Sequence, residues 1–265
     1  MSATGAPDLH AELAFALELA DLADAETLHR YERRAFTVDH KADRSEVTEA
    51  DRQAEAAVRA RIAEARPTHG ILGEEEGVLG PADAEWRWII DPVDGTSNFV
   101  RGIPVWATLI ALAHAERGPL LGVVSAPAMR RRWWGVDGLG AFADGTPLHV
   151  SAIDRLEEAQ VCVTFSQGWD ELGLTPALVR MQSAAWRARG FGDFWQHMLV
   201  AEGAVEIAVD AIGVQPYDVA AVGVIVRAAG GSFTDRFGSP SISTGSAVSS
   251  NGLLHAEVIR RLNEP

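Results

Sequence analysis

The sequence is poor in cysteine, in lysine and in positive charge generally. Its single cysteine, Cys162, excludes a disulfide framework and a thiolate zinc cluster, and it fits a reducing compartment. Its single lysine is Lys41, so almost all of the 23 basic residues are arginines, and they are outnumbered by 37 acidic residues. The net charge of -14 argues against a protein that wraps duplex nucleic acid or binds an anionic membrane.

Long apolar runs are also missing. The longest uncharged apolar stretch, residues 102–113, is too short to cross a bilayer. Acidic residues in the N-terminal stretch predict an amphipathic helix there rather than a signal peptide. With 265 residues, 47% of them hydrophobic and 23% charged, the chain is globular rather than disordered, collagen-like or a coiled coil. We therefore expect a cytoplasmic protein with neither a membrane nor a nucleic-acid partner.

Hydrophobic periodicity predicts a mixed α/β protein. Apolar residues at three- and four-residue steps predict helices over 8–36 and 48–66. Short apolar runs bounded by glycine and proline predict strands over 86–90, 105–113, 120–125, 131–136, 148–151, 160–164, 186–189, 205–209, 232–234 and 247–249. Later helices are predicted over 175–182, 192–202, 216–229 and 253–262. We expect an N-terminal α+β part, residues 1–150, and a C-terminal α/β part, residues 151–265, that share a cleft.

The most informative segment is Trp88-Ile-Ile-Asp-Pro-Val-Asp-Gly-Thr-Ser. Its apolar residues predict a buried strand that ends at Asp91, and Pro92 cannot continue a sheet ladder. Asp94 follows closely enough for both carboxylates to turn toward one point. The Gly-Thr-Ser amides that come next can open a short helix whose free N–H groups suit a phosphate. By contrast, Asp144-Gly145-Thr146 has no apolar strand before it, and we interpret it as a hairpin turn.

Other carboxylates also lie at the ends of apolar elements. Glu74 follows Ile71-Leu72-Gly73, whereas its neighbours Glu75 and Glu76 are typical of a solvated acidic loop. Thr48 and Asp51 form a capping-box pattern, which alone explains both residues. Asp218 follows Pro216 at a predicted helix start, which is again sufficient explanation.

Taken together, four such carboxylates suggest a site for a hard cation: Glu74, Asp91, Asp94 and Asp218. Ligands that offer only oxygen favour Mg²⁺ or Mn²⁺. Zinc is disfavoured, since the eight histidines show no paired spacing. The stretch 138–143 matches a loose dinucleotide fingerprint, but no helix is predicted after it, so we interpret it as a turn.

These motifs resemble those of the inositol-monophosphatase superfamily of Mg²⁺-dependent phosphatases. The resemblance rests on the motifs at residues 73–75, 91–96, 47–51 and 218–221, the last followed by residues 228–231. It covers nearly the whole chain. It implies a layered αβαβα sugar-phosphatase fold, usually in a homodimer. It also implies that two or three metal ions are held by Glu74, Asp91, the Val93 carbonyl, Asp94 and Asp218. One departure is Tyr217, where the family usually has tryptophan.

The resemblance further implies catalytic and substrate-binding roles. Asp51 and Thr96, with Glu74, would orient and activate a water for in-line attack on phosphorus, with no phosphoenzyme. The phosphate of a small phosphorylated substrate would be held by Gly95, Thr96 and Ser97 together with the Asp218 site. Arg189 and Asp193 match the family's substrate-side motif.

Three stretches, 98–107, 125–134 and 249–255, look most like the bacterial histidinol-phosphatase branch. An inositol-specific member usually has a histidine where Val105 follows Pro104. Asp193 would then pair with the ammonium of histidinol phosphate, and Trp195 or Tyr217 would face its ring, although a core position on an apolar helix explains Trp195 equally well. Asp210 is either a second acidic contact or a solvated loop residue. The alternatives are an inositol-1-phosphate or other sugar-phosphate phosphatase, and a metal-dependent binding or regulatory protein whose site is vestigial.

Overall fold

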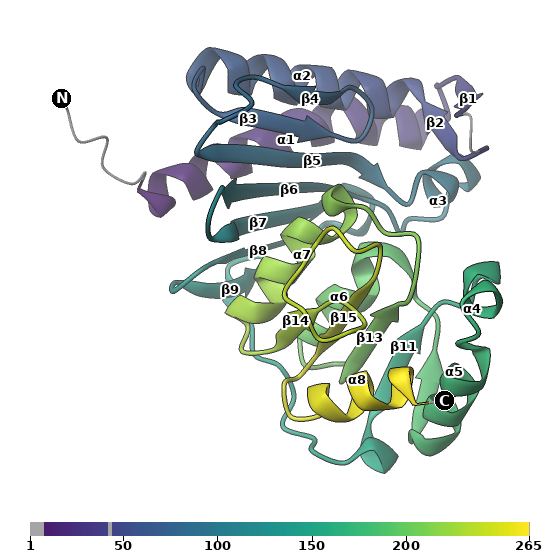
Figure 1. The fold of residues 1–265 in the computed structure, drawn as a ribbon. Coiled ribbons are helices and arrows are strands. Elements are labelled where there is room, and N and C mark those ends of the chain that lie inside the picture. Colours follow the sequence, from purple (N-terminus) through teal and green to yellow (C-terminus); the bar gives the residue numbers. More distant parts are fainter. Residues whose placement is uncertain (1–7, 42–43, 265) are drawn as a thin grey trace.

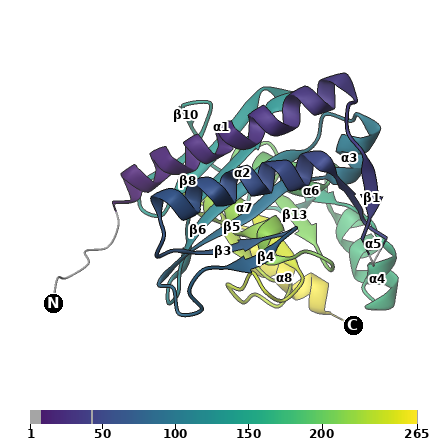
Figure 2. The same ribbon diagram turned by 90° about the horizontal axis from the view of Figure 1, so that it is seen from above.

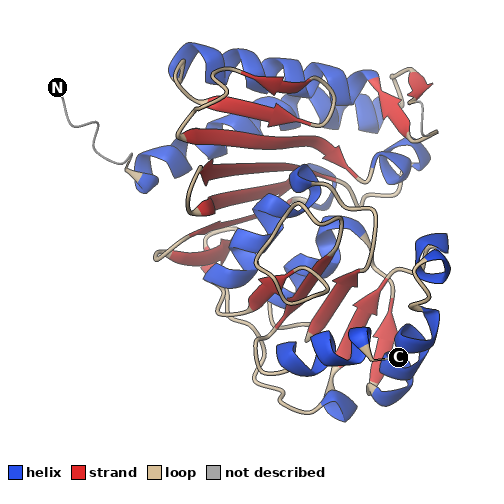
Figure 3. Ribbon diagram, viewed as in Figure 1, coloured by secondary structure: helices blue, strands red, loops and turns tan. Residues whose placement is uncertain are grey.

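The computed structural model describes residues 8–41 and 44–264. Two sheets and three layers of helices alternate, so the architecture is the predicted αβαβα sandwich (Figures 1 and 3). Helices α1 (Leu9–Arg33) and α2 (Glu49–Ala65) lie side by side over the outer face of the larger sheet (Figure 2). None of the helices in the described ranges is both long and apolar enough to span a lipid bilayer.

The larger sheet has eight strands in the order β10-β9-β8-β7-β6-β5-β3-β4. Only β3 and β5 pair in parallel. The chain leaves β3 through the antiparallel hairpin with β4 and then crosses, without a helix, to the other side of β3, where β5 begins. The strands are β3 (Gly70–Gly73), β4 (Gly77–Leu79), β5 (Trp86–Asp94), β6 (Ala107–His114), β7 (Gly118–Ala126), β8 (Arg131–Val136), β9 (Gly140–Ala143) and β10 (Thr146–Pro147). A separate hairpin pairs β1 (Val38–His40) with β2 (Glu46–Thr48).

The smaller sheet has the order β12-β11-β13-β15-β14. Its strands are β11 (Gln160–Val163), β12 (Arg187–Arg189), β13 (Ile207–Asp210), β14 (Ser232–Thr234) and β15 (Ala247–Ser250). Helices α6 (Asp193–Ala201) and α7 (Pro216–Ala228) lie between the sheets, whereas α5 (Thr175–Ala184) and α8 (His255–Asn263) cover the outer face. The remaining short helices are α3 (Thr96–Arg101), α4 (Gln167–Glu171), Pro127–Met129 and Leu156–Glu158.

Two glycines let α7 pack directly on the larger sheet. A Cβ on Gly122 would lie 2.4 Å from the Ala221 carbonyl oxygen, and one on Gly135 would lie 2.8 Å from the Ile225 Cα. Side chains at these strand positions would push the helix away from the sheet. The close approach fixes the height of α7 above the sheet and therefore the position of Asp218 in its first turn.

Most predicted elements are present, with some differences. The strand predicted over 148–151 is wrong: these residues are irregular, and the short β10 precedes them. Leu148 instead packs into the core and Val150 donates its N–H to the Ala229 carbonyl. The 138–143 stretch begins as the predicted turn but continues as β9, and Asp144-Gly145 forms the predicted hairpin turn. The β1–β2 hairpin, β4 and α4 are not among the predicted elements.

The division at residue 150 stays a prediction. The larger sheet uses strands up to Pro147 and the smaller sheet begins at Gln160. However, α7 belongs to the C-terminal half and packs on β7 of the larger sheet, so one hydrophobic core contains residues of both halves.

Candidate active site

The end of β5 presents two aspartates through a β-bulge. Asp91 pairs with Leu109 and Asp94 with Ala107, so the register shifts between the two aspartates. Pro92 lies within this irregularity, as its missing N–H requires. The Asp91 Oδ1 accepts the Val93 N–H at 3.0 Å, which fixes the turn of the chain. Both carboxylates therefore leave the sheet on the same side.

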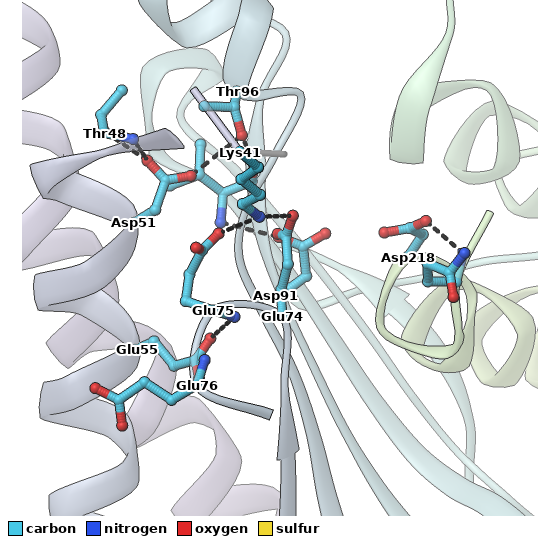
Figure 4. Close-up of polar contacts among 12 residues, drawn as sticks. Lys41, Thr48, Asp51, Glu55, Glu74, Glu75, Glu76, Asp91, Thr96 and Asp218 are labelled. Atoms are coloured by element: carbon cyan, nitrogen blue, oxygen red, sulfur yellow. Dashed lines mark hydrogen bonds and ion pairs between the residues drawn. The ribbon is translucent and has the colours of Figure 1, made fainter. Parts of the chain in front are cut away.

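Asp218 reaches the same point from the other half of the chain. It lies in the first turn of α7, where its Oδ2 accepts the Gln215 N–H at 2.6 Å as part of a capping box. Carboxylate oxygens of Asp91, Asp94 and Asp218 all lie within 4.8 Å of one another. Figure 4 shows Asp218, at the start of α7, opposite Asp91.

The electrostatics of these three aspartates suit a bound cation. Burial, then repulsion from Glu74, Asp94 and Asp218, raises the pKa of Asp91 well above its usual range. Desolvation, then repulsion from Asp193 and Asp218, does the same to the pKa of Asp94. Burial and repulsion from Glu74 raise the pKa of Asp218 to about 7, although the Gln215 N–H opposes this. Such crowded oxygen ligands fit a hard divalent ion, which would relieve the repulsion.

Asp51 joins the start of α2 to Thr96. Its Oδ2 accepts the Thr48 N–H at 2.9 Å and the Thr48 hydroxyl at 2.5 Å, so the predicted capping box is confirmed. Its other oxygen accepts the Thr96 hydroxyl at 3.1 Å (Figure 4). That hydroxyl also lies 3.0 Å from the Val93 carbonyl oxygen. Burial raises the pKa of Asp51 despite these hydrogen bonds. The same carboxylate thus caps a helix and contacts the site.

Lys41 is a neighbour of the site that the sequence interpretation missed. Its Nζ lies 2.7 Å from the Glu74 Oε1 and 2.7 Å from the Glu75 Oε1 (Figure 4). The description of Glu75 as a solvated loop residue is wrong, since its side chain is only 8% exposed, whereas the Glu76 side chain is 58% exposed. Being the only lysine of an arginine-rich chain was the one signal that pointed to Lys41.

Glu55 is a second missed residue. Its side chain is fully buried, and its two oxygens accept the N–H groups of Glu75 at 2.8 Å and Glu76 at 3.0 Å. Arg59 pairs with it at 3.2 Å. A Cβ on Gly73 would lie 2.1 Å from the Glu55 carboxylate, so only glycine fits there. Glu55 therefore holds the turn that presents Glu74.

The Gly-Thr-Ser segment forms the predicted short helix. Gly95 caps α3 with a φ of 84°, a left-handed conformation that favours glycine. The first amides of a helix lack intrahelical acceptors, which leaves those of Thr96 and Ser97 for a ligand. The Ser97 hydroxyl, however, donates to Glu46 at 2.6 Å, and Asn98 donates its amide to Asp193 at 2.8 Å.

A cavity of about 230 Å³ adjoins the metal-ligand candidates. Asp94 and Asp218 line it together with Asp193, Asp210 and Trp169, and the described lining includes neither lysine nor arginine. Desolvation and repulsion from Asp210 raise the pKa of Asp193 to about 6. The cavity thus carries excess negative charge beyond the three clustered aspartates.

Asp210 is not a solvated loop residue. It ends β13, where His197 approaches it at 2.8 Å through Nε2 and Gln196 donates to it at 2.7 Å. The other ring nitrogen of His197 lies 2.7 Å from the Ser249 hydroxyl. The hydrogen bonds that join Ser249, His197 and Asp210 therefore orient Asp210 toward the cavity.

The remaining substrate-side candidates are placed elsewhere. Trp195 packs against Phe191 with ring centroids 5.0 Å apart, and neither Trp195 nor Tyr217 is among the described residues that line the cavity. Arg189 lies on the edge strand β12, where it is exposed and donates to the neighbouring Ala188 carbonyl at 2.7 Å.

Comparison with known proteins gives a consistent result. The model of the inositol monophosphatase family matches residues 8–264. A histidinol-phosphatase of Streptomyces coelicolor is 43% identical over 97% of this chain and 99% of its own. A histidinol-phosphatase of Mycobacterium tuberculosis is 46% identical over 96% of this chain and 98% of its own length. The solved structure of an inositol monophosphatase from Anabaena (Nostoc) has a TM-score of 0.83 at 29% identity and covers 97% of this chain and 96% of its own.

Proposed function

This chain belongs to the inositol monophosphatase family, and on that premise we propose that it hydrolyses L-histidinol phosphate to L-histidinol and phosphate with Mg²⁺, a step of histidine biosynthesis. The reaction class follows from the family, whose members are phosphatases. The substrate rests on the two histidinol-phosphatase relatives, which match nearly the whole chain at 43% and 46% identity.

The clustered carboxylates support a metal-dependent reaction. We assign Asp91, Asp94 and Asp218 to Mg²⁺, with Glu74 and the Val93 carbonyl as further ligands of two or three ions; Mn²⁺ offers the same ligand preferences. When bound, divalent ions neutralise the carboxylates, acidify water and stabilise the charge of the phosphoryl oxygens and the leaving alkoxide. The Lys41 ammonium pairs with Glu74 at 2.7 Å and would compete with an ion for that carboxylate.

The protein's own groups orient the reactants. The Thr96 hydroxyl, held between Asp51 and the Val93 carbonyl, is suited to position the attacking water, and Asp51 is suited to receive its proton through Thr96. The amides at the start of α3, at Gly95, Thr96 and Ser97, are suited to hold phosphate oxygens. None of these roles requires a covalent phosphoenzyme.

The cavity beside the cluster supports a cationic leaving group. Asp193 and Asp210 add negative charge, and Trp169 adds an aromatic wall. Histidinol carries an ammonium and an imidazole, which match these features. An uncharged inositol would offer no cationic partner to Asp193, whose carboxylate accepts the Asn98 amide. Arg189, on its edge strand, stays a prediction as a substrate contact, as do the homodimer and the cytoplasmic location.

A phosphate-release panel tests the substrate. It contains histidinol phosphate, inositol 1-phosphate, fructose 1,6-bisphosphate and an adenosine bisphosphate, each with saturating Mg²⁺. We expect the highest kcat/KM with histidinol phosphate. A preference for inositol 1-phosphate would refute the substrate while leaving the phosphatase chemistry, and the absence of turnover on all four would favour a vestigial binding protein.

The Asp193→Ala variant tests the ammonium contact. A charge-assisted hydrogen bond contributes about 1.5–3 kcal/mol, so its loss should lower kcat/KM for histidinol phosphate roughly 10–100-fold. The value for an uncharged sugar phosphate should change much less. The exposed Asp154→Ala provides the matched control. Equal losses on both substrates, with an unchanged melting curve, would mean that Asp193 supports α3 through Asn98 rather than the substrate.

A further inference from the structure

Arg87 is the anomalous arginine of this protein. It lies on β5 and is only partly exposed, yet its guanidinium makes no hydrogen bond, ion pair or ring contact with any residue in the described ranges. Its Nε is completely buried and lacks a partner. Three other partly or fully buried arginines, Arg59, Arg66 and Arg132, each contact a carboxylate, and the partly buried Arg236 lies over the Phe237 ring. A desolvated donor without an acceptor is costly, so this exception requires an explanation.

The position of Arg87 leaves space around it. In the sheet it lies between Gly70 of β3, which has no side chain, and Ala113 of β6, whose methyl group covers little of the strand surface. A cavity of about 460 Å³ opens there, and Arg87 lines it. This volume lies within the range of roughly 300–1,000 Å³ that is typical of small-molecule sites. The cavity is distinct from the one beside the clustered aspartates, because the two share no lining residue.

The walls of this cavity are mainly apolar. They come from four separate segments: the larger sheet with the residue after β6, the loop before β5, Pro216 at the start of α7, and the 242–243 stretch. The apolar lining comprises Leu72, Ala82, Ala84, Ile89, Ala113, Ala115, Pro216 and Ile242. A guanidinium facing such walls suits a ligand with one anionic end and one apolar body.

We propose that this cavity binds a small monocarboxylate with an apolar chain, whose carboxylate pairs with Arg87. A carboxylate matches the planar fork of the guanidinium and would supply the missing acceptors. A phosphate dianion fits less well, because one guanidinium faces it and Asp83 also lines the cavity. The ligand would touch Pro216, the first residue of α7, which also carries Asp218.

Hexanoate is a suitable probe, with hexan-1-ol as its uncharged match. Binding to the full-length protein with Mg²⁺ is measured by saturation-transfer NMR and isothermal titration. We expect saturable millimolar binding of hexanoate and at least tenfold weaker binding of hexan-1-ol. Arg87→Gln should weaken hexanoate binding at least tenfold, whereas Arg155→Gln, at an exposed arginine outside the cavity, should not change it.

A second variant covers the case in which Arg87→Gln unfolds. Ala82→Trp changes an exposed loop residue that lines the cavity and should obstruct it with Arg87 intact. We expect it to abolish hexanoate binding and leave the melting curve nearly unchanged. The proposal is overturned if wild-type protein shows no saturable binding, if hexan-1-ol binds equally well, or if the folded Arg87 or Ala82 variant binds like wild type. None of these outcomes depends on the substrate of the enzyme.

Discussion

Replacing Glu55 by glutamine tests how the turn that carries Glu74 is held. Glu55 is fully buried and accepts the N–H groups of Glu75 and Glu76 at 2.8 and 3.0 Å. A glutamine keeps the volume but offers one oxygen and one NH₂ group, so one backbone N–H would face another donor. The ion pair with Arg59 would also lose its charge. The turn should therefore hold Glu74 in the observed geometry in a smaller fraction of molecules.

The magnitude follows from the lost contact. One charge-assisted hydrogen bond contributes about 1.5–3 kcal/mol, which corresponds to roughly a 10–100-fold change in an equilibrium constant. If the turn adopts the metal-competent geometry in a correspondingly smaller fraction of molecules, the apparent affinity for Mg²⁺ falls by that factor. We expect kcat at saturating Mg²⁺ to change much less than the Mg²⁺ concentration required for half-maximal effect.

The assay is a Mg²⁺ titration followed both by melting temperature and by phosphate release. Glu76→Gln is the matched control, because Glu76 lies in the same turn and also pairs with Arg59, at 3.2 Å, but its side chain is 58% exposed. An exposed pair contributes at most about 1 kcal/mol, so the control should shift by less than about fivefold. If Glu55→Gln folds and its Mg²⁺ titration matches that of wild type, Glu55 does not position the turn.

Further predictions concern the carboxylates around the metal-ligand cluster. Asp91→Asn, like EDTA treatment, should abolish phosphate release, because the substitution removes the charge of one of the three clustered carboxylates. Full activity in either case would contradict the metal assignment. Asp51→Asn, whose amide oxygen can still accept the Thr48 N–H, should lower kcat roughly 10²–10⁴-fold with little change in KM. A raised KM alone would make Asp51 a structural or substrate contact. In metal-free protein the pKa of Asp218 is raised from 3.8 to about 7, so the folded state binds the proton more tightly than the unfolded state. The stabilisation from this bound proton on Asp218 is complete below about pH 4 and is lost as the pH rises toward 7. The melting temperature in EDTA should therefore fall over this range. Mg²⁺ should then raise the melting temperature more at about pH 8 than at pH 5. A melting temperature in EDTA that does not change with pH would show that folding does not raise the pKa of Asp218.

The local features of the site could be predicted because short-range chemistry decides them. The apolar run before Asp91 forms a strand wherever it is buried, and Pro92 interrupts the ladder by lacking an N–H. Thr48 with Asp51, and Pro216 with Asp218, start helices through contacts within one turn. The family motifs extend these local signals to a fold and a reaction class.

The tertiary structure alone decided which of these features meet. Asp218 joins Asp91 and Asp94 because α7 packs on the larger sheet at Gly122 and Gly135, a contact that no local pattern encodes. Glu55 looks like an ordinary charge of an amphipathic helix, and only the packing of the Glu75 turn against α2 buries it. Asp210 likewise gains its partners, His197 and Gln196, from α6. Burial and hydrogen-bond partners depend on chain segments far apart in sequence, whereas caps, turns and strand ends depend on neighbours, so the sequence specified the ligands but not the network that holds them.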